Sequence, residues 1–135
     1  PESSRYTEWD TEIFPEGLYE GIQQVWNKYH LPIYITENGI GLYEDTSVNQ
    51  VEDDDRIEFM DMHIAAVLKA KEGGCDVRGY YAWSPFDLYS WKNGTEKRYG
   101  LVAIDYENGL ERRPKKSYYW YKDVIETDGK HITGK

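Results

Sequence analysis

Two short apolar strands separated by an amphipathic helix constrain this fold more than any other feature of the sequence. Residues 33–37 and 77–83 are rich in the aromatic and β-branched side chains that favour strands. Between them, residues 56–72 carry apolar side chains at helical spacing, and Gly73-Gly74 follows as a stop signal. A strand, a crossover helix and a second strand imply parallel neighbours in an α/β sheet.

The segments on either side extend this pattern. The other expected elements are a helix Pro15–Tyr29, loops 40–54 and 84–99, a strand at about 100–106, a hairpin-type turn 107–109, a helix from Pro114 to about Ile125, and a frayed polar tail from Thr127. The first helix has apolar residues at helical spacing, namely Leu18, Ile22, Val25, Trp26 and Tyr29.

The chain of 135 residues has too few such strands for a complete α/β domain. Two parallel strands cannot close a barrel or bury both faces of a sheet. The chain also begins with Pro-Glu-Ser-Ser rather than with an initiating Met. We therefore expect the C-terminal piece of a larger α/β enzyme, with a small self-sufficient α+β domain as the alternative.

The charge balance excludes some classes of partner. A net charge of −9 argues against nucleic acid and against an anionic membrane surface. The acidic run 52–55 is expected to be a solvated loop leading into a helix N-terminus, since it lacks the ligand spacing of an EF-hand. No metal or organic cofactor is expected. No apolar stretch approaches the ~18 residues of a membrane span.

Two residues with reactive side chains are expected to be structural. Cys75 is the only cysteine, so no intrachain disulfide can form and a reducing compartment is expected. Its place at the start of an apolar strand indicates a small buried filler. His63 lies beside the apolar face of helix 56–72, and no second ligand lies one turn away, so we expect it to be packed rather than to bind a metal.

Glu37 is the first candidate catalytic residue. It ends an apolar strand and is followed by Asn38-Gly39, which turns the chain away. Catalytic groups of α/β proteins lie at the C-terminal ends of buried strands, where loops gather. A carboxylate nucleophile needs such a rigid position facing a cleft, although a solvated strand end is the alternative.

The loop 84–99 is the second candidate region. Loops longer than about 12–15 residues within compact domains are usually functional or disordered, and this one is too aromatic for disorder. Its hydroxyls and its ammonium groups form a reasonable receptor for phosphate or sulfate. A basic surface loop is the alternative.

Four motifs, in order, resemble glycoside hydrolase family one, a family of retaining β-glycosidases on a (β/α)8 TIM barrel. The motifs are Ile35-Thr36-Glu37-Asn38-Gly39, Tyr81-Ala82-Trp83-Ser84, Lys97-Arg98-Tyr99-Gly100-Leu101 and Pro114-Lys115-Lys116-Ser117-Tyr118-Tyr119-Trp120-Tyr121-Lys122. The resemblance covers nearly the whole chain. It implies that residues 1–135 are about the last quarter of a single barrel domain.

By this resemblance, Glu37 matches the family's nucleophile. Trp83 matches the tryptophan that forms the floor of the sugar subsite. The family's β-glucosidases typically have Asn-Phe-Glu-Trp where this chain has residues 88–91, with Ser in place of Glu. The change is similar to the 6-phospho-β-glycosidase branch. The residues that would then hold the 6-phosphate are Ser90, Lys97 and Tyr99.

The resemblance also implies a reaction and a setting. Trp91 favours a 6-phospho-β-galactosidase over a 6-phospho-β-glucosidase, with dual specificity still open. The implied substrates are phosphorylated disaccharides or aryl β-glycosides, in the carbohydrate catabolism of a bacterial cytoplasm. The alternatives are an unphosphorylated β-glucosidase and a non-catalytic phosphosugar-binding remnant.

The resemblance leaves one catalytic group outside this sequence. The family's acid/base lies in an Asn-Glu-Pro motif that is absent here. We therefore expect the remainder of the barrel to be a required partner and this piece alone to be inactive. Asp87 is the only carboxylate near Trp83 in sequence, and it is expected to organise the loop rather than to act as the acid.

Overall fold

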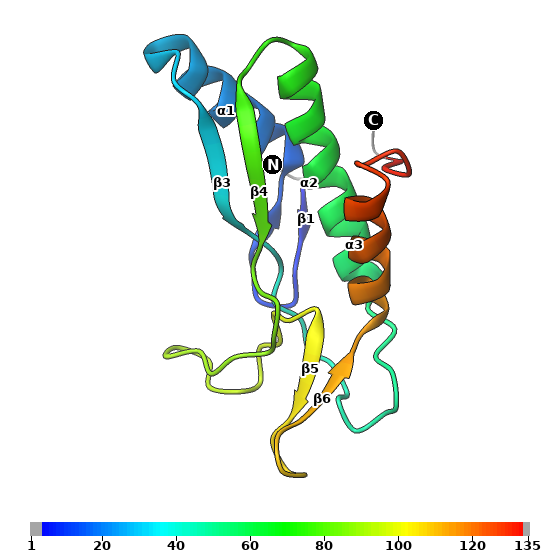
Figure 1. Cartoon of the computed structure of the whole chain (residues 1–135). Coiled ribbons are helices and arrows are strands. Elements are labelled where there is room, and N and C mark those ends of the chain that lie inside the picture. Colours follow the sequence, from blue (N-terminus) through cyan, green and yellow to red (C-terminus); the bar gives the residue numbers. More distant parts are fainter. Residues whose placement is uncertain (1–3, 134–135) are drawn as a thin grey trace.

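The computed structural model describes residues 4–133 and contains the expected alternation of strands and helices (Figure 1). In chain order the elements are β1 (Arg5–Tyr6), β2 (Glu12–Ile13), α1 (Pro15–Tyr29), β3 (Ile33–Asn38), α2 (Asp54–Glu72), β4 (Val77–Ala82), β5 (Val102–Asp105), β6 (Glu111–Pro114) and α3 (Lys116–Glu126). The bounds of α1 are those expected, and those of α2, β3 and β4 differ by one or two residues.

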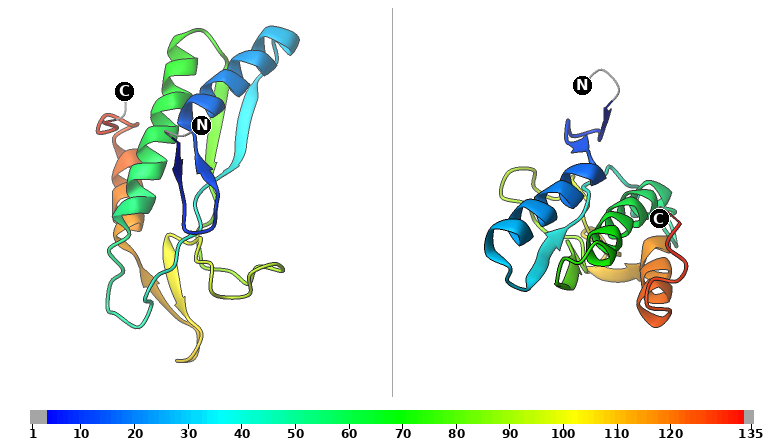
Figure 2. Two further views of the ribbon diagram at one scale, coloured as in Figure 1. Left: turned by 180° about the vertical axis from the view of Figure 1, so that it is seen from behind. Right: turned by 90° about the horizontal axis from the view of Figure 1, so that it is seen from above.

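The strands β3 and β4 form the parallel pair that the sequence predicted. Ile33 pairs with Val77 and Ile35 pairs with Tyr80. Helices α1 and α2 pack side by side on one face of this pair (Figures 1 and 2). Cys75 is buried between them, which confirms its expected role as a filler. The buried residues of this small core are Ile22, Val67, Ala70, Cys75 and Val77.

Helix α1 packs only part of its apolar face against this core. Only Ile22 is buried, whereas Val25 and Tyr29 are 46% and 56% exposed. On the face of the β3–β4 pair away from the helices, Tyr34 and Tyr81 are also more than half exposed. The helix predicted from the apolar spacing is confirmed, and Leu18 and Trp26 are partly buried against the same core.

The expected turn 107–109 joins the antiparallel strands β5 and β6. Val102 pairs with Pro114 and Asp105 pairs with Glu111. The Asp105 carboxylate accepts hydrogen bonds from the backbone N–H groups of residues 107 and 108, both at 3.1 Å. Gly109 has a φ of +68°, a conformation that glycine adopts without strain. The turn is confirmed, although β5 is shorter than expected.

Two terminal features were not predicted. The β1–β2 hairpin precedes α1, and its two-residue strands show too little alternation to be recognised in the sequence. At the other end, the expected fraying from Thr127 is wrong as far as Thr133. Ile132 is buried, and Thr133 donates hydrogen bonds to the Asp61 carboxylate at 2.9 and 2.8 Å.

The acidic run before α2 is not simply a solvated loop. Asp53 is only 4% exposed, because its carboxylate accepts hydrogen bonds from α2 and α3. Arg56 Nε donates to it at 2.8 Å, and Ser117 donates from its backbone N–H at 2.9 Å and from its hydroxyl at 2.5 Å. Asp53 therefore ties together the N-termini of α2 and α3, which corrects the prediction for this position.

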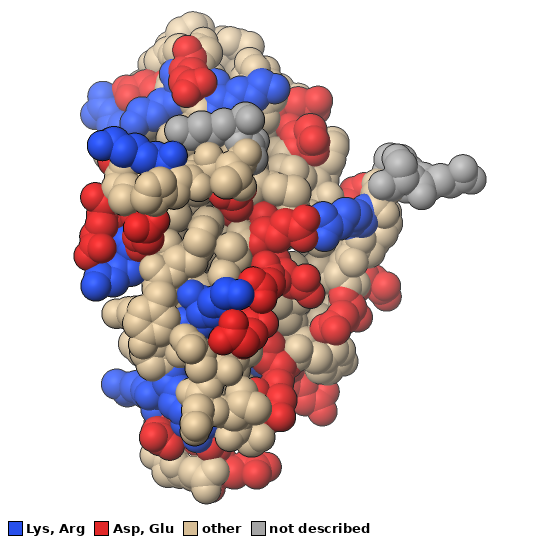
Figure 3. All heavy atoms as spheres, turned by 90° about the vertical axis from the view of Figure 1, so that its right-hand side faces the viewer, with Lys and Arg blue, Asp and Glu red and all other residues tan. Residues whose placement is uncertain are grey.

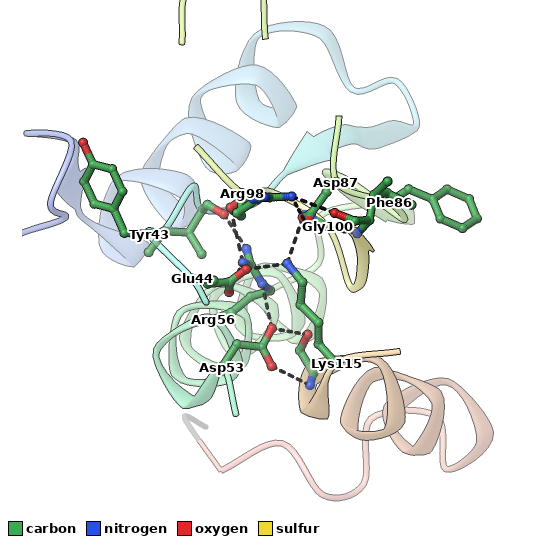
Figure 4. A network of polar contacts seen from close by, with 12 residues as sticks. Tyr43, Glu44, Asp53, Arg56, Phe86, Asp87, Arg98, Gly100 and Lys115 are labelled. Carbon is green, nitrogen blue, oxygen red and sulfur yellow. Dashed lines mark hydrogen bonds and ion pairs between the residues drawn. The ribbon is translucent and has the colours of Figure 1, made fainter. Parts of the chain in front are cut away.

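A buried charge network extends from Asp53 into the loops (Figure 4). Arg56 also donates to Glu44 Oε1 at 2.5 Å, and Lys115 Nζ donates to Glu44 Oε2 at 2.5 Å and to Asp87 Oδ1 at 2.8 Å. The side chains of Asp53, Arg56, Lys115 and Asp87 are at most 1% exposed, and that of Glu44 is 5% exposed. Each cation is matched by a carboxylate, which is the condition for burying charge.

Asp87 connects this network to the two ends of the loop 84–99. Its carboxylate accepts hydrogen bonds from the Gly100 N–H at 2.9 Å and the Ile104 N–H at 3.3 Å. Arg98 donates to the same carboxylate at 3.3 Å and to the Ile104 carbonyl at 2.9 Å. The expectation that Asp87 organises the loop is confirmed.

The outer surface reflects the acidic composition. On the face that carries α3, acidic side chains form a broken band beside the basic ones (Figure 3). Between residues 4 and 133, no helix has both the length and the apolar character needed to cross a membrane.

Replacing Lys115 by Met is expected to destabilise the protein by about 3–5 kcal/mol, because it leaves the buried network with three carboxylates, those of Asp53, Glu44 and Asp87, for the two cations Arg56 and Arg98. Lys116→Met is the matched control, since Lys116 pairs with Glu52 and Asp54 on the surface. Urea unfolding measures both variants. Equal losses of stability in the two variants would contradict this account of the network.

His63 is expected to make stability depend on pH. It is 5% exposed and stacks on Phe59 at 3.9 Å between ring centroids, and its Nδ1–H donates to the Phe59 carbonyl at 2.7 Å. Burial lowers the pKa of His63, although that hydrogen bond and the charge of Glu16 oppose the shift. The packed position expected for His63 is confirmed.

Because the pKa of His63 is lower in the folded state, the unfolded chain binds more protons as the pH falls below about 6.5. His63 should then add no pH dependence above that pH, and its contribution should lower the free energy of unfolding as the pH falls below it. His63→Gln should reduce this slope in urea titrations at a series of pH values. His131→Gln is the control for loss of a surface histidine, and an unchanged slope in His63→Gln would refute the assignment.

Candidate active site

Glu37 lies at a bulge near the C-terminal end of β3. From the pair Ile35–Tyr80 to the pair Asn38–Ala82, β3 advances by one residue more than β4. The bulge falls at Thr36 and Glu37, whose side chains are both exposed. Bulges redirect side chains and are common beside active sites. Within residues 4–133, no group donates a hydrogen bond to the Glu37 carboxylate, so its oxygens are free to react.

Asn38 fixes the backbone next to Glu37. Its carbonyl accepts a hydrogen bond from the Trp83 N–H at 2.8 Å, and its side-chain oxygen accepts one from the Tyr80 hydroxyl at 2.8 Å. Burial raises the pKa of Tyr80 far above its ordinary value, and the neighbouring Tyr121 adds to the shift. Tyr80 therefore stays protonated and remains a donor, which holds Asn38 in one orientation.

Trp83 is held beside the turn that follows Glu37. A Cβ on Gly39 would lie 1.8 Å from the Trp83 carbonyl oxygen, so no other residue fits at position 39 without movement. The indole of Trp83 is 40% exposed and the peptide bond to Ser84 is cis. The close contact joins the ends of β3 and β4, and it places a flat apolar surface near the candidate nucleophile.

The segment that contains Lys97 and Tyr99 is hydrogen-bonded on both sides to this end of the molecule. The Tyr99 carbonyl accepts a hydrogen bond from the Ser84 N–H at 3.0 Å. Arg98 and Leu42 exchange two backbone hydrogen bonds, both at 2.9 Å. The structure thus brings Trp83 and the segment 97–99 together near the end of β3, the strand that contains Glu37.

Lys97 differs from the other buried or partly buried cations. Its ammonium lies over the rings of Trp9 and Tyr99, at 5.2 and 5.5 Å from their centroids. Its aliphatic stem crosses Gly41, where an added Cβ would lie 2.3 Å from Lys97 Cε. No carboxylate of the described chain lies within ion-pair distance of it, so its positive charge is available to an anionic ligand.

Ser90 and Trp91 lie at the tip of the loop 84–99, and no contact joins them to Lys97 or Tyr99. Ser90 and Gly94 exchange backbone hydrogen bonds at 2.8 Å, which closes a small turn. The Ser90 oxygen accepts hydrogen bonds from two backbone N–H groups at 3.3 Å, and its nearest side-chain acceptor, on Asn93, is 3.5 Å away. Its hydroxyl hydrogen is thus weakly engaged, and Trp91 is 93% exposed.

Several residues that shape the site were not singled out from the sequence. Trp9 belongs to the unpredicted N-terminal hairpin. Tyr80 lies within β4, and its sequence position gives no sign of a role beyond that of a strand residue. Gly41 could have been recognised from the sequence. Two glycines close together, Gly39 and Gly41, indicate a loop that closely approaches other parts of the chain. The described residues include no group of three or more His, Cys, Asp or Glu side chains able to hold a metal ion.

This arrangement combines an unpaired carboxylate, a flat aromatic surface and an unneutralised ammonium at one end of a parallel strand pair. The carboxylate can act as a nucleophile or a general base. The aromatic ring suits the apolar face of a sugar, and the ammonium suits an anionic substituent.

Comparison with known proteins shows the family of this chain. The family model described as "Glycosyl hydrolase family 1" matches residues 2–130. A "6-phospho-beta-galactosidase" of Leptotrichia buccalis is 47% identical over 128 residues, which are 93% of this chain and 27% of that protein. This chain therefore spans about a quarter of the length of that relative.

Solved structures agree with this match. A family 1 β-glucosidase of Thermotoga maritima in complex with isofagomine lactam has a TM-score of 0.89 and 36% sequence identity, covering 94% of this chain and 29% of that one. A β-glucosidase of the same organism in complex with castanospermine gives the same values. Because the family model covers nearly all of its residues, this chain belongs to glycosyl hydrolase family 1.

Proposed function

We propose that the protein containing this chain hydrolyses 6-phospho-β-glycosides with retention of configuration, and that 6-phospho-β-galactosides are its preferred substrates. The observation that carries the proposal is the unneutralised ammonium of Lys97 beside Tyr99. The fully buried cations Arg56 and Lys115 are, in contrast, paired with carboxylates. A partly buried lysine without such a partner suits a substrate that brings its own negative charge.

Glu37 acts as the nucleophile in this proposal. Its carboxylate attacks the anomeric carbon, an ester bond forms, and the bond to the departing oxygen breaks. A second carboxyl, supplied by the part of the barrel outside this chain, protonates that oxygen and then removes a proton from the attacking water. The two carboxyl groups of a retaining glycosidase lie about 5–5.5 Å apart.

The other end of the sugar is held through its phosphate. Lys97 supplies a positive charge, and the hydroxyls of Ser90 and Tyr99 donate hydrogen bonds. Ser90 lies at the loop tip, so the phosphate must bridge the tip and Lys97 in this proposal. A Glu at position 90 would instead repel the phosphate, by about 4 kcal/mol for each unit-charge pair at ~4 Å and an effective dielectric constant of ~20.

The preference for the galacto substrate rests on Trp91 and on the named relative. The indole of Trp91 is 93% exposed, and its N–H is available to an axial hydroxyl. The 47% identical relative is a 6-phospho-beta-galactosidase. An ordinary β-glucosidase is the second candidate, favoured by the 36% identical solved structures. A non-catalytic phosphosugar-binding remnant is disfavoured by the intact and accessible Glu37.

The proposed setting follows from the family. Residues 1–135 form about the last quarter of a (β/α)8 TIM barrel, and the catalytic pair is complete only with the rest of that barrel. The single cysteine, which is buried, supports a reducing compartment such as the bacterial cytoplasm. The substrates in view are phosphorylated disaccharides and aryl β-glycosides, without a metal or organic cofactor.

Replacing Glu37 by Gly in the full-length protein should lower kcat for nitrophenyl 6-phospho-β-galactoside by at least about 1,000-fold, because the covalent step is lost. Inactivation by a fluorinated substrate analogue, followed by peptide mass spectrometry, should place the label on Glu37. Glu107→Gln, at an exposed turn, is the control. A label on another peptide would overturn the assignment.

Ser90→Glu should abolish hydrolysis of phosphorylated substrates while preserving the unphosphorylated reaction. The added carboxylate repels the phosphate and removes a hydroxyl donor. Initial rates on phosphorylated and unphosphorylated nitrophenyl β-galactosides measure the change, with Ser47→Glu on the exposed loop as the control. High activity of Ser90→Glu on the phosphorylated substrate would exclude Ser90 from the phosphate site.

A further inference from the structure

We propose that Trp9, in the N-terminal hairpin, is a positioning residue that holds the Lys97 ammonium where the substrate phosphate binds, and so helps to set the preference for phosphorylated substrates. The proposal rests on the proposed function. It deepens that function by assigning a role to a segment that lies outside all four motifs. Trp9 orients Lys97 and does not itself touch the substrate.

The hairpin turn gives Trp9 a defined position. Thr7 Oγ1 accepts a hydrogen bond from the Trp9 N–H at 3.2 Å, and the Thr7 carbonyl accepts one from the Asp10 N–H at 3.0 Å. Asp10 adopts a φ of +55°, as expected in a tight turn where Asp is tolerated. The turn reaches the end of the molecule at which β3 and β4 finish (Figures 1 and 2).

Two contacts attach this turn to the loop that follows Glu37. Glu8 accepts a hydrogen bond from the Tyr43 N–H at 2.9 Å. The Trp9 ring stacks on the Tyr43 ring, with 4.5 Å between centroids and 24° between planes. Tyr43 follows Leu42, which exchanges backbone hydrogen bonds with Arg98. A continuous set of contacts therefore runs from Trp9 to the residue next to Lys97.

Trp9 also acts on Lys97 directly. The ammonium lies over the indole at 5.2 Å from the ring centroid, a distance at which the ring attracts a cation. A lysine side chain has four rotatable bonds, and no carboxylate among the described residues fixes the position of this one. The rings of Trp9 and Tyr99 and the backbone of Gly41 are what restrict it. They attract the charge without neutralising it, so the ammonium remains available to phosphate.

The indole N–H argues against a purely structural role in this part of the chain. It is buried and has no hydrogen-bond partner among residues 4–133, which is unfavourable for a tryptophan chosen only to fill space. The faces of the ring carry its contacts instead, through Tyr43 and Lys97. An attraction that depends on the π-electrons of the ring distinguishes this position from an apolar packing site.

The test is made in the full-length protein, with tryptophan analogues of increasing fluorination incorporated at position 9. Fluorine withdraws electrons from the ring and weakens its attraction for a cation while its shape is nearly kept, so folding is preserved. The measured quantity is kcat/KM for nitrophenyl 6-phospho-β-galactoside and for the unphosphorylated galactoside. For the phosphorylated substrate, kcat/KM should fall by about 3- to 30-fold between the unfluorinated and the fully fluorinated ring, mainly because KM rises. For the unphosphorylated substrate, kcat/KM should change by less than about 2-fold.

Conventional variants complete the test. Trp9→Leu should lower kcat/KM for the phosphorylated substrate as much as full fluorination does. Trp9→Phe should keep most of the preference for the phosphorylated over the unphosphorylated substrate. Tyr6→Leu, in the same hairpin but exposed, should leave both rates unchanged. In a Lys97→Met background, Trp9→Leu should have no further effect on the ratio of the two rates. If Trp9→Leu lowered the ratio of the two rates equally in the presence and absence of Lys97, the proposal would be overturned.

The remaining outcomes separate this inference from the proposed function. If Lys97→Met abolishes the preference for the phosphorylated substrate but fluorination at position 9 changes nothing, the function stands and the role of Trp9 is refuted. If fluorination lowers both rates equally, Trp9 is structural and the inference is again refuted. If Lys97→Met keeps the preference for phosphate, the proposed function and the role of Trp9 both fail.

Discussion

The ion pairs of Lys115 with Asp87 and Glu44 are the constraint on which the candidate site depends. A fully buried ammonium is tolerated only because both carboxylates lie within 2.8 Å of it. Those carboxylates belong to the two long loops that follow β3 and β4, whereas Lys115 precedes α3. One residue therefore links both long loops to the helical layer. The ion pairs hold both loops, which have little regular secondary structure of their own, against the start of α3.

The same electrostatic rule accounts for the contrast between the paired cations and Lys97. Arg56 and Lys115 are buried, neutralised and hydrogen-bonded, so they have no capacity left for a ligand. Lys97 is partly buried and lies among aromatic rings that attract it but supply no negative charge. The carboxylates of the network hold the loops, and among the partly buried cations of residues 4–133 the Lys97 ammonium has no carboxylate partner. Glu37, with no donor from the described residues, is the corresponding free anion.

The sequence predicted the parts of this structure that depend on local pattern and missed those that depend on long-range pairing. The β3–α2–β4 unit, the turn at 107–109 and the packed His63 follow from periodicity, turn chemistry and the absence of a second ligand. Asp53 was misjudged because an acidic run before a helix is usually solvated, and nothing nearby indicated that Ser117 would reach it from 64 residues away. Trp9 was overlooked because two-residue strands leave almost no pattern to detect.

The loop between Asp87 and Arg98 is anchored at its base and free at its tip. Asp87 and Arg98 are tied to the rest of the fold, while Ser90 and Gly94 hydrogen-bond to each other. Substitutions at the tip therefore cost the fold little, and yet the tip carries the residues that would read the sugar. If the proposed function holds, this separation would let exposed tip positions change the sugar preference while the scaffold beneath them stays as it is.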